Sequence, residues 1–240
     1  YKGGKLVAEN GKMLHQKEKN TDWSTEIKER VFHSFHRVPI TVEELQLKET
    51  TGTHQRVIDM VAHELITKER IEEWKELPGV APGVDISRDI VKLAAIERHK
   101  NTGHVGLGFL GKYGLKKGAV ATSIGHDSHN LVIAGVTDED MVLAGNRVIE
   151  NGGGLAIALE GKVLADLPLP IGGLMADEPV EVVDEKLEHM KKLSVELGIS
   201  EDIDAFMTLA FISLPVIPKL RLNTYGVVDV EKHQVVEARF

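Results

Sequence analysis

Short runs of β-branched and small apolar residues punctuate the second half of the chain and predict strands. The runs at 90–97, 118–124 and 131–136 are apolar almost throughout, which is typical of strands that are buried on both faces. Two further strands are expected at 155–159 and 162–167, because a Glu-Gly pair between them favours a turn. The pattern therefore predicts a sheet with buried central strands.

Two segments in the same half carry apolar residues at helical spacing. The first covers residues 138–150, where one face holds Met141, Ala144, Val148 and Ile149. The second runs from about 179 to 197, with a proline near its first turn and a glycine just past its end. Helices interspersed with strands in this way predict an α+β fold, in which the helices pack on a mixed sheet.

The beginning of the chain has the pattern of a β-hairpin. Residues 5–9 and 12–15 flank an Asn-Gly pair, which favours a tight turn between two strands. A hairpin at this place leaves an edge exposed, so its partner strands are expected elsewhere. A flexible start with no structural role is the alternative for the first glycines.

A change in composition divides the chain into two predicted parts. One more strand is expected at 56–61, and proline and glycine then cluster at 77–83, the clearest break in the sequence. We therefore predict a β-rich segment over residues 1–84 and an α+β domain over residues 85–240.

Composition narrows the class of protein. Hydrophobic residues make up 42% of the chain and aromatic residues 5%, which predicts a sizeable aliphatic core. The net charge is −8 and lies within residues 101–240, so we expect no nucleic-acid surface. No apolar run reaches the length of a membrane span, and cysteine is absent. The default expectation is a cytoplasmic protein with no membrane partner.

The loop between the strands at 118–124 and 131–136 is the richest in potential chemistry. Six of its eight residues, 123 to 130, have side chains that bind, donate or exchange protons. We predict an auxiliary catalytic role for His126, Asp127 and His129. We predict substrate contacts for Ser123, Ser128 and Asn130. The competing interpretation is that these side chains only satisfy backbone groups in a tight turn.

A second polar cluster follows the strand at 90–97. Glu97 and His99 stand at the end of this apolar run, where sheets commonly place binding groups, and we predict that both contact substrate. A structural pair between Arg98 and a carboxylate is the alternative. His33 and His36 also have a metal-like spacing, but Phe35 separates them and no acidic residue adjoins them, so zinc binding is not expected there.

Several motifs in fixed order resemble the C-terminal region of bacterial and archaeal adenine deaminases, which belong to the amidohydrolase superfamily. They lie at 97–99, 102–103, 114–118, 126–130, 152–154, 167–175, 206–209 and 214–218. Motifs in a fixed order are more specific than any single one. The resemblance implies an enzyme of purine salvage that hydrolyses adenine to hypoxanthine and ammonia.

The resemblance also implies what this chain lacks. Amidohydrolases hold a divalent metal, here expected to be manganese or iron, in a (β/α) barrel of about 250 residues. That barrel carries a His-x-His pair, which this sequence does not contain. We therefore expect this chain to be the portion of an adenine deaminase that follows the catalytic barrel, with the barrel as its partner, and no residue here matches the metal ligands of the family. The resemblance further implies a homo-oligomer. It also implies that the β-rich segment, with its opening hairpin, is the returning half of a small β-sandwich, which amidohydrolases assemble from strands before and after the barrel.

Three functions remain open at the level of sequence. In the first, the chain caps or supports the barrel active site, binds adenine only as part of the whole enzyme, and is inactive alone. In the second, it is a structural or dimerisation domain without catalytic groups. In the third, it is an independent hydrolase whose metal is held by His126, His129 and either Glu97 or His99.

Overall fold

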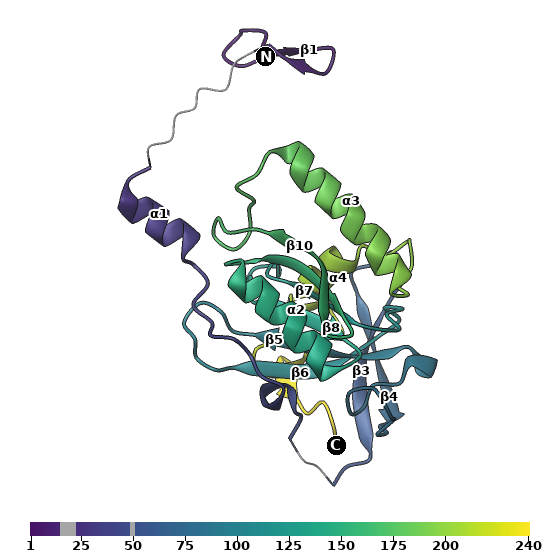
Figure 1. Ribbon diagram of the computed structural model, residues 1–240. Coiled ribbons are helices and arrows are strands. Elements are labelled where there is room, and N and C mark those ends of the chain that lie inside the picture. The colour runs from purple at the N-terminus through teal and green to yellow at the C-terminus, as the bar shows by residue number, and fades with distance from the viewer. Residues whose placement is uncertain (15–22, 49–50) are drawn as a thin grey trace.

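The computed structural model describes residues 1–14, 23–48 and 51–240, and its centre is one large mixed sheet (Figure 1). In the described chain this sheet has eight strands, in the order β10 (Lys162–Pro168), β9 (Gly154–Leu159), β7 (Ala119–Thr122), β8 (Leu131–Gly135), β5 (Ile90–Ile96), β6 (Val105–Gly111), β3 (His54–Met60) and β4 (Thr67–Glu73). Neighbours are antiparallel except β3 and β6, which run parallel. Together with the helices, this sheet confirms the predicted α+β class.

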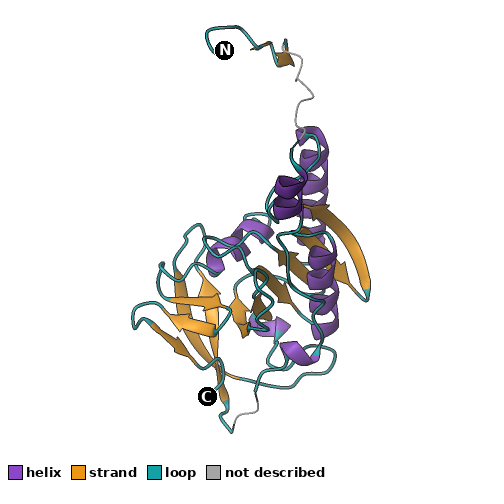
Figure 2. Cartoon of the chain, turned by 90° about the vertical axis from the view of Figure 1, so that its left-hand side faces the viewer, coloured by secondary structure: helices purple, strands orange, loops and turns teal. Residues whose placement is uncertain are grey.

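Helices cover both faces of the sheet (Figure 2). Helix α2 (Asp138–Glu150) packs Met141, Ala144 and Val148 against one face. Its amino end is capped by Thr137, whose side chain accepts a hydrogen bond from the Asp140 N–H. The predicted bounds of this helix are therefore confirmed, and both the stripe and the cap explain why it forms there.

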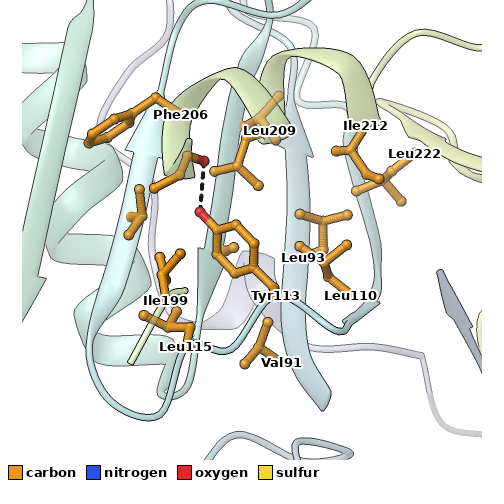
Figure 3. Packing of buried hydrophobic residues seen from close by; sticks show 14 of the residues in the cluster. Val91, Leu93, Leu110, Tyr113, Leu115, Ile199, Phe206, Leu209, Ile212 and Leu222 are labelled. Atoms are coloured by element: carbon orange, nitrogen blue, oxygen red, sulfur yellow. Dashed lines mark hydrogen bonds between the residues drawn. The ribbon is translucent and has the colours of Figure 1, made fainter. Parts of the chain in front are cut away.

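The opposite face is covered by α3 (Val180–Glu196), α4 (Ala205–Ile212) and a small antiparallel sheet. That sheet contains β11 (Leu220–Asn223), β12 (Gly226–Asp229) and β13 (Gln234–Val236). The core between these layers is aliphatic, with Leu93, Leu110, Leu209 and Leu222 meeting at its centre (Figure 3). Tyr113 is buried among them, and its hydroxyl donates to the Ala205 carbonyl over 2.7 Å (Figure 3). Burial raises the pKa of this phenol well above its ordinary value.

The first residues form a short hairpin, as the Asn-Gly pair predicts. Its strands are β1 (Ala8–Glu9) and β2 (Lys12–Met13), with Ala8 opposite Met13. The predicted strands were longer, and residue 15 lies outside the described residues. The expectation that a β-sandwich includes this hairpin stays a prediction.

The large sheet takes strands from both sides of residue 84. Strands β3 and β4 precede this residue, and β3 pairs with β6, which follows it. The division of the chain into 1–84 and 85–240 stays a prediction.

Strand β6 was not predicted from the sequence, because three of its seven residues are glycine. The structure supplies the reason for two of them. A Cβ atom at Gly106 would lie 1.8 Å from the Asn223 carbonyl oxygen, and one at Gly111 would lie 2.0 Å from a carboxylate oxygen of Asp59. The glycines therefore permit close approach of the second sheet and of β3.

Helices α1 (Thr25–Phe32) and α4 were also missed. Helix α4 is apolar on nearly every side and so lacks the periodicity that predicts a helix, but the Asp204 carboxylate caps it by accepting from two backbone N–H groups. No helix within the described ranges is long and apolar enough to cross a membrane.

Candidate functional site

The 123–130 loop joins β7 to β8, as predicted, and its backbone is a tight turn. The His129 N–H donates to the Gly125 carbonyl over 2.7 Å, and the Ser128 N–H donates to the His126 carbonyl over 2.8 Å. Asp127 and His129 both have positive φ, 62° and 45°. The His126 N–H bonds the Ala210 carbonyl in α4, so the loop is also fixed to the helix layer.

His126 and Asp127 are accessible from solvent. Their side chains are 47% and 78% exposed, and the His126 Nδ1 atom lies 3.6 Å from an Asp127 carboxylate oxygen. The His126 ring packs against the ring of Phe211 with 4.6 Å between centroids. A ring held on one face and open on the other is suited to contact with a second planar group.

His129 is partly buried and has a different environment. Its Nδ1 atom is buried and has no hydrogen-bond partner among the described residues. Burial, followed by the charge of Arg98 and the nearby His126 and His99, lowers its pKa, and Asp127 opposes this shift. The ring is therefore neutral at pH 7. A buried Nδ1–H group without an acceptor would cost more free energy than a buried, unprotonated Nδ1 atom. We therefore assign the ring proton to Nε2.

Glu97 and His99 lie beside the loop, but most of their polar atoms are occupied. The Glu97 carboxylate accepts from the backbone N–H groups of His99, Lys100 and Thr102 and from the Thr102 hydroxyl, over 2.6 to 3.1 Å. Burial opposes these bonds, which nonetheless lower the pKa of Glu97 to about 2. The His99 Nε2 atom lies 2.7 Å from the Ser128 carbonyl oxygen, to which it donates. The strand end and the loop are thus in direct contact.

The remaining predicted substrate contacts have mixed positions. Ser123 is fully buried, and its hydroxyl accepts from the Gly154 N–H over 2.7 Å and donates to the Gly173 carbonyl over 2.6 Å. The side chain of Ser128 is exposed, whereas the Asn130 Oδ1 atom is buried without a partner in the described chain. Ser123 has a structural task, and the substrate role predicted for these residues stays a prediction.

Sequence reasoning missed two residues that the fold brings to the site. Arg98 was interpreted as the partner of a carboxylate, but its guanidinium donates to the carbonyls of His129, Gly172 and Ser34. Phe211 is remote in sequence and lies in a helix that the pattern did not predict. The position of Arg98, between Glu97 and His99 directly after an apolar run, was the one available signal.

An open depression adjoins the strand end. It is lined by Glu29, Arg30, His33, Ser34, His36 and His99. His33, just past the end of α1, bonds Glu29 through Nδ1 at 2.9 Å, one turn away along the chain. The depression places further polar side chains next to His99, although the sequence assigned them no role.

The donor set does not fit a metal ion. In residues 1–14, 23–48 and 51–240, no group of three His, Cys, Asp or Glu side chains has an arrangement that could hold one. The atoms of Glu97 and His99 that would complete such a group with the loop histidines are engaged elsewhere. We therefore derive no step through a metal held by these residues.

The fold and this loop define an α+β domain that presents accessible histidine and aspartate side chains at one end of a sheet. The chain belongs to the adenine deaminase C-terminal domain family, whose sequence model matches residues 64–234.

Curated relatives extend this match over nearly the whole chain. It is 43% identical over 237 residues to adenine deaminase 2 of Carboxydothermus hydrogenoformans, a match that covers 98% of this chain and 40% of that protein. It is 43% identical over 236 residues to the adenine deaminase of Kosmotoga olearia, with coverage of 98% and 40%. For the adenine deaminase of Lysinibacillus sphaericus, the identity is 39% over 238 residues, with coverage of 99% and 40%. The chain thus spans about 40% of the length of these relatives.

Proposed function

We propose that this chain is the C-terminal part of an adenine deaminase and that its 123–130 loop caps or supports the active site of the catalytic barrel. The whole enzyme adds water to the purine carbon that bears the amine, the carbon–nitrogen bond breaks, and hypoxanthine and ammonia leave. Family membership supports the reaction. The observation that carries the capping role is the loop itself, in which neither imidazole is taken up by a backbone acceptor of the described chain.

The loop side chains have distinct tasks in this proposal. His129, neutral with its proton on Nε2, donates a hydrogen bond to the edge of the purine or passes a proton through one. His126, held against Phe211, packs on the planar substrate, and Asp127 orients it. The loop as a whole excludes water when it closes on the barrel.

The divalent metal of the reaction belongs, in this proposal, to the barrel and not to this chain. Manganese or iron held by the barrel would supply the activation of the attacking water. The partners are therefore adenine, the barrel and further copies of the same protein. The 240-residue chain alone does not deaminate adenine at the rate of an intact enzyme.

A chimera tests this proposal. The part of the Carboxydothermus hydrogenoformans relative that this chain does not match is joined to residues 1–240, and ammonia release from adenine is measured with manganese supplied. We expect the chimera to be active, and each part alone to be inactive or far slower. Equal ammonia release by the 240-residue chain would instead establish an independent hydrolase.

A second variant separates capping from a purely structural role. His129→Ala in the chimera is compared with Arg147→Met, a substitution on α2 in an ion pair with Asp166. If the loop only supports the fold, both variants will retain the rate of the unsubstituted chimera per folded molecule. A structural or dimerisation domain would then be the better description.

A further inference from the structure

We propose that Arg98 is the positioning residue of the 123–130 loop, a buried guanidinium that sets the placement of His129. This inference rests on the proposed function only for its catalytic consequence. The placement of His129 by Arg98 is a property of the folded chain and does not depend on the proposed function.

The contacts of Arg98 carry the inference. The side chain is buried, 2% exposed, just beyond β5. Its Nε atom donates to the His129 carbonyl over 2.5 Å, Nη2 to the Gly172 carbonyl over 3.1 Å, and Nη1 to the Ser34 carbonyl over 3.4 Å. One side chain therefore joins the loop to two other segments that are far from it in sequence.

The partners of Arg98 leave its charge uncompensated. Buried arginines are ordinarily paired with carboxylates, whereas all three acceptors here are neutral carbonyls. The Phe35 ring lies 4.9 Å below the guanidinium and adds a cation–π contact. Burial lowers the pKa of Arg98 to about 10, against the attraction of Glu97, so the group remains cationic at neutral pH.

The surrounding backbone is shaped to admit this guanidinium. Gly173 has a φ of 74°, and a Cβ atom there would lie 2.7 Å from Arg98 Nη1. The Gly173 carbonyl is fixed from the other side by the Ser123 hydroxyl at 2.6 Å. A larger residue at 173 would displace the arginine, so the turn and Arg98 form one unit.

His129 is the group on which this unit acts. The charged or titratable groups around it are Arg98, His126, His99 and Asp127. The first three disfavour a proton on the ring and only Asp127 favours one. Arg98 is the one permanent cation among these four. It therefore holds the His129 backbone in place while opposing protonation of the ring.

Nuclear magnetic resonance of the 240-residue chain tests the inference without any assay of activity. The ring signals of His129 are followed against pH in the unsubstituted chain, in Arg98→Met and in Arg98→Lys. We expect the midpoint of His129 to move upward in Arg98→Met, because the repelling charge is gone. In Arg98→Lys the charge stays but the planar three-way contact is lost, so the backbone signals of residues 126–130 shift while the midpoint changes less.

Arg147→Met is the matched control, since it removes an arginine from an ion pair on α2. It should leave both the His129 midpoint and the loop signals unchanged. The inference is overturned if folded Arg98→Met and Arg98→Lys give the loop signals and the midpoint of the unsubstituted chain. It is equally overturned if both variants unfold throughout, because Arg98 would then support the whole fold and not this loop.

The chimera gives the catalytic consequence. Arg98→Lys should lower kcat about tenfold with a smaller change in KM, and Arg98→Met should move the acidic limb of the pH profile to higher pH. If His129→Ala leaves the chimera fully active, the proposed function fails, yet the resonance experiment still decides the role of Arg98. If His129→Ala is slow and Arg98→Lys is not, the positioning role fails alone.

Discussion

Two clusters of charged side chains lie at opposite ends of β5, and they differ in how their members are paired. Before the strand, Arg70 bonds both carboxylate oxygens of Asp59 at 2.9 and 3.0 Å and also reaches Glu72, and Arg88 bonds Glu72 and Asp85. After the strand, His126 and Asp127 approach each other at 3.6 Å without a guanidinium partner in the described chain, and the buried Nδ1 atom of His129 has no hydrogen-bond partner there.

The comparison shows that density of charge in the sequence does not by itself indicate a site. The first cluster is a closed network, in which every carboxylate has a guanidinium partner, and it links β3, β4 and the turn before β5. The second has polar groups with unused hydrogen-bonding capacity. Functional groups are therefore expected where pairing is incomplete.

The largest effect should come from His129 in the chimera. His129→Ala is expected to lower kcat/KM by about 10² or more, the usual contribution of a group that donates or relays a proton. Thermal unfolding of the same protein should stay nearly unchanged, because the ring makes no hydrogen bond within the described chain. If the chimera with His129→Ala unfolds instead, His129 has a structural role, as the side chains of the closed network do.

Arg70 belongs to the closed network, so we expect its substitution to change the stability of the protein and not its catalytic rate. Arg70→Met leaves the largely buried Asp59 carboxylate without its two-bond partner and should lower the free energy of unfolding by about 2 kcal/mol. Urea unfolding of the 240-residue chain measures this. The folded chimera with the same change should keep its kcat/KM, and a large loss of rate would mean that this cluster also serves catalysis.

Glu97 lies at the loop end of β5 but is bonded like a member of the closed network. Because its pKa is lowered from 4.5 to about 2, folding releases its proton and the charged form stabilises the native state. This stabilisation is present above pH 4.5 and is lost as the pH falls towards 2. Glu97→Gln should cost about 1 kcal/mol at pH 7, and the difference from the unsubstituted chain should shrink below pH 4.5. A difference that does not change with pH would contradict the assignment of this stabilisation to the charged form of Glu97.

The smallest effect on stability should come from Asp127. Asp127→Asn keeps a side chain that tolerates positive φ and removes only an exposed carboxylate 3.6 Å from His126. The free energy of unfolding should change by less than about 0.5 kcal/mol. A loss well above this in a urea titration would show that the carboxylate supports the turn.

The local sequence pattern was sufficient to predict those elements whose structure is determined by residues close to them in sequence. The bounds of α2 follow from its stripe and its cap, and β7, the loop and β8 follow from two apolar runs around a polar one. The density of titratable groups in residues 126–129 was likewise visible in the sequence. These features depend on periodicity and side-chain type, which a sequence displays directly.

The sequence by itself therefore determined the α+β class, the polar loop and the likeness to adenine deaminases. Only the tertiary structure decided that β6 is an interior strand of the sheet, since two of its glycines are explained by the Asn223 carbonyl and the Asp59 carboxylate that approach them. It also decided that Arg98 meets three carbonyls and that Phe211 supports His126. These contacts join residues between 31 and 85 positions apart, and no local preference encodes such pairings, because they form only when the whole core closes.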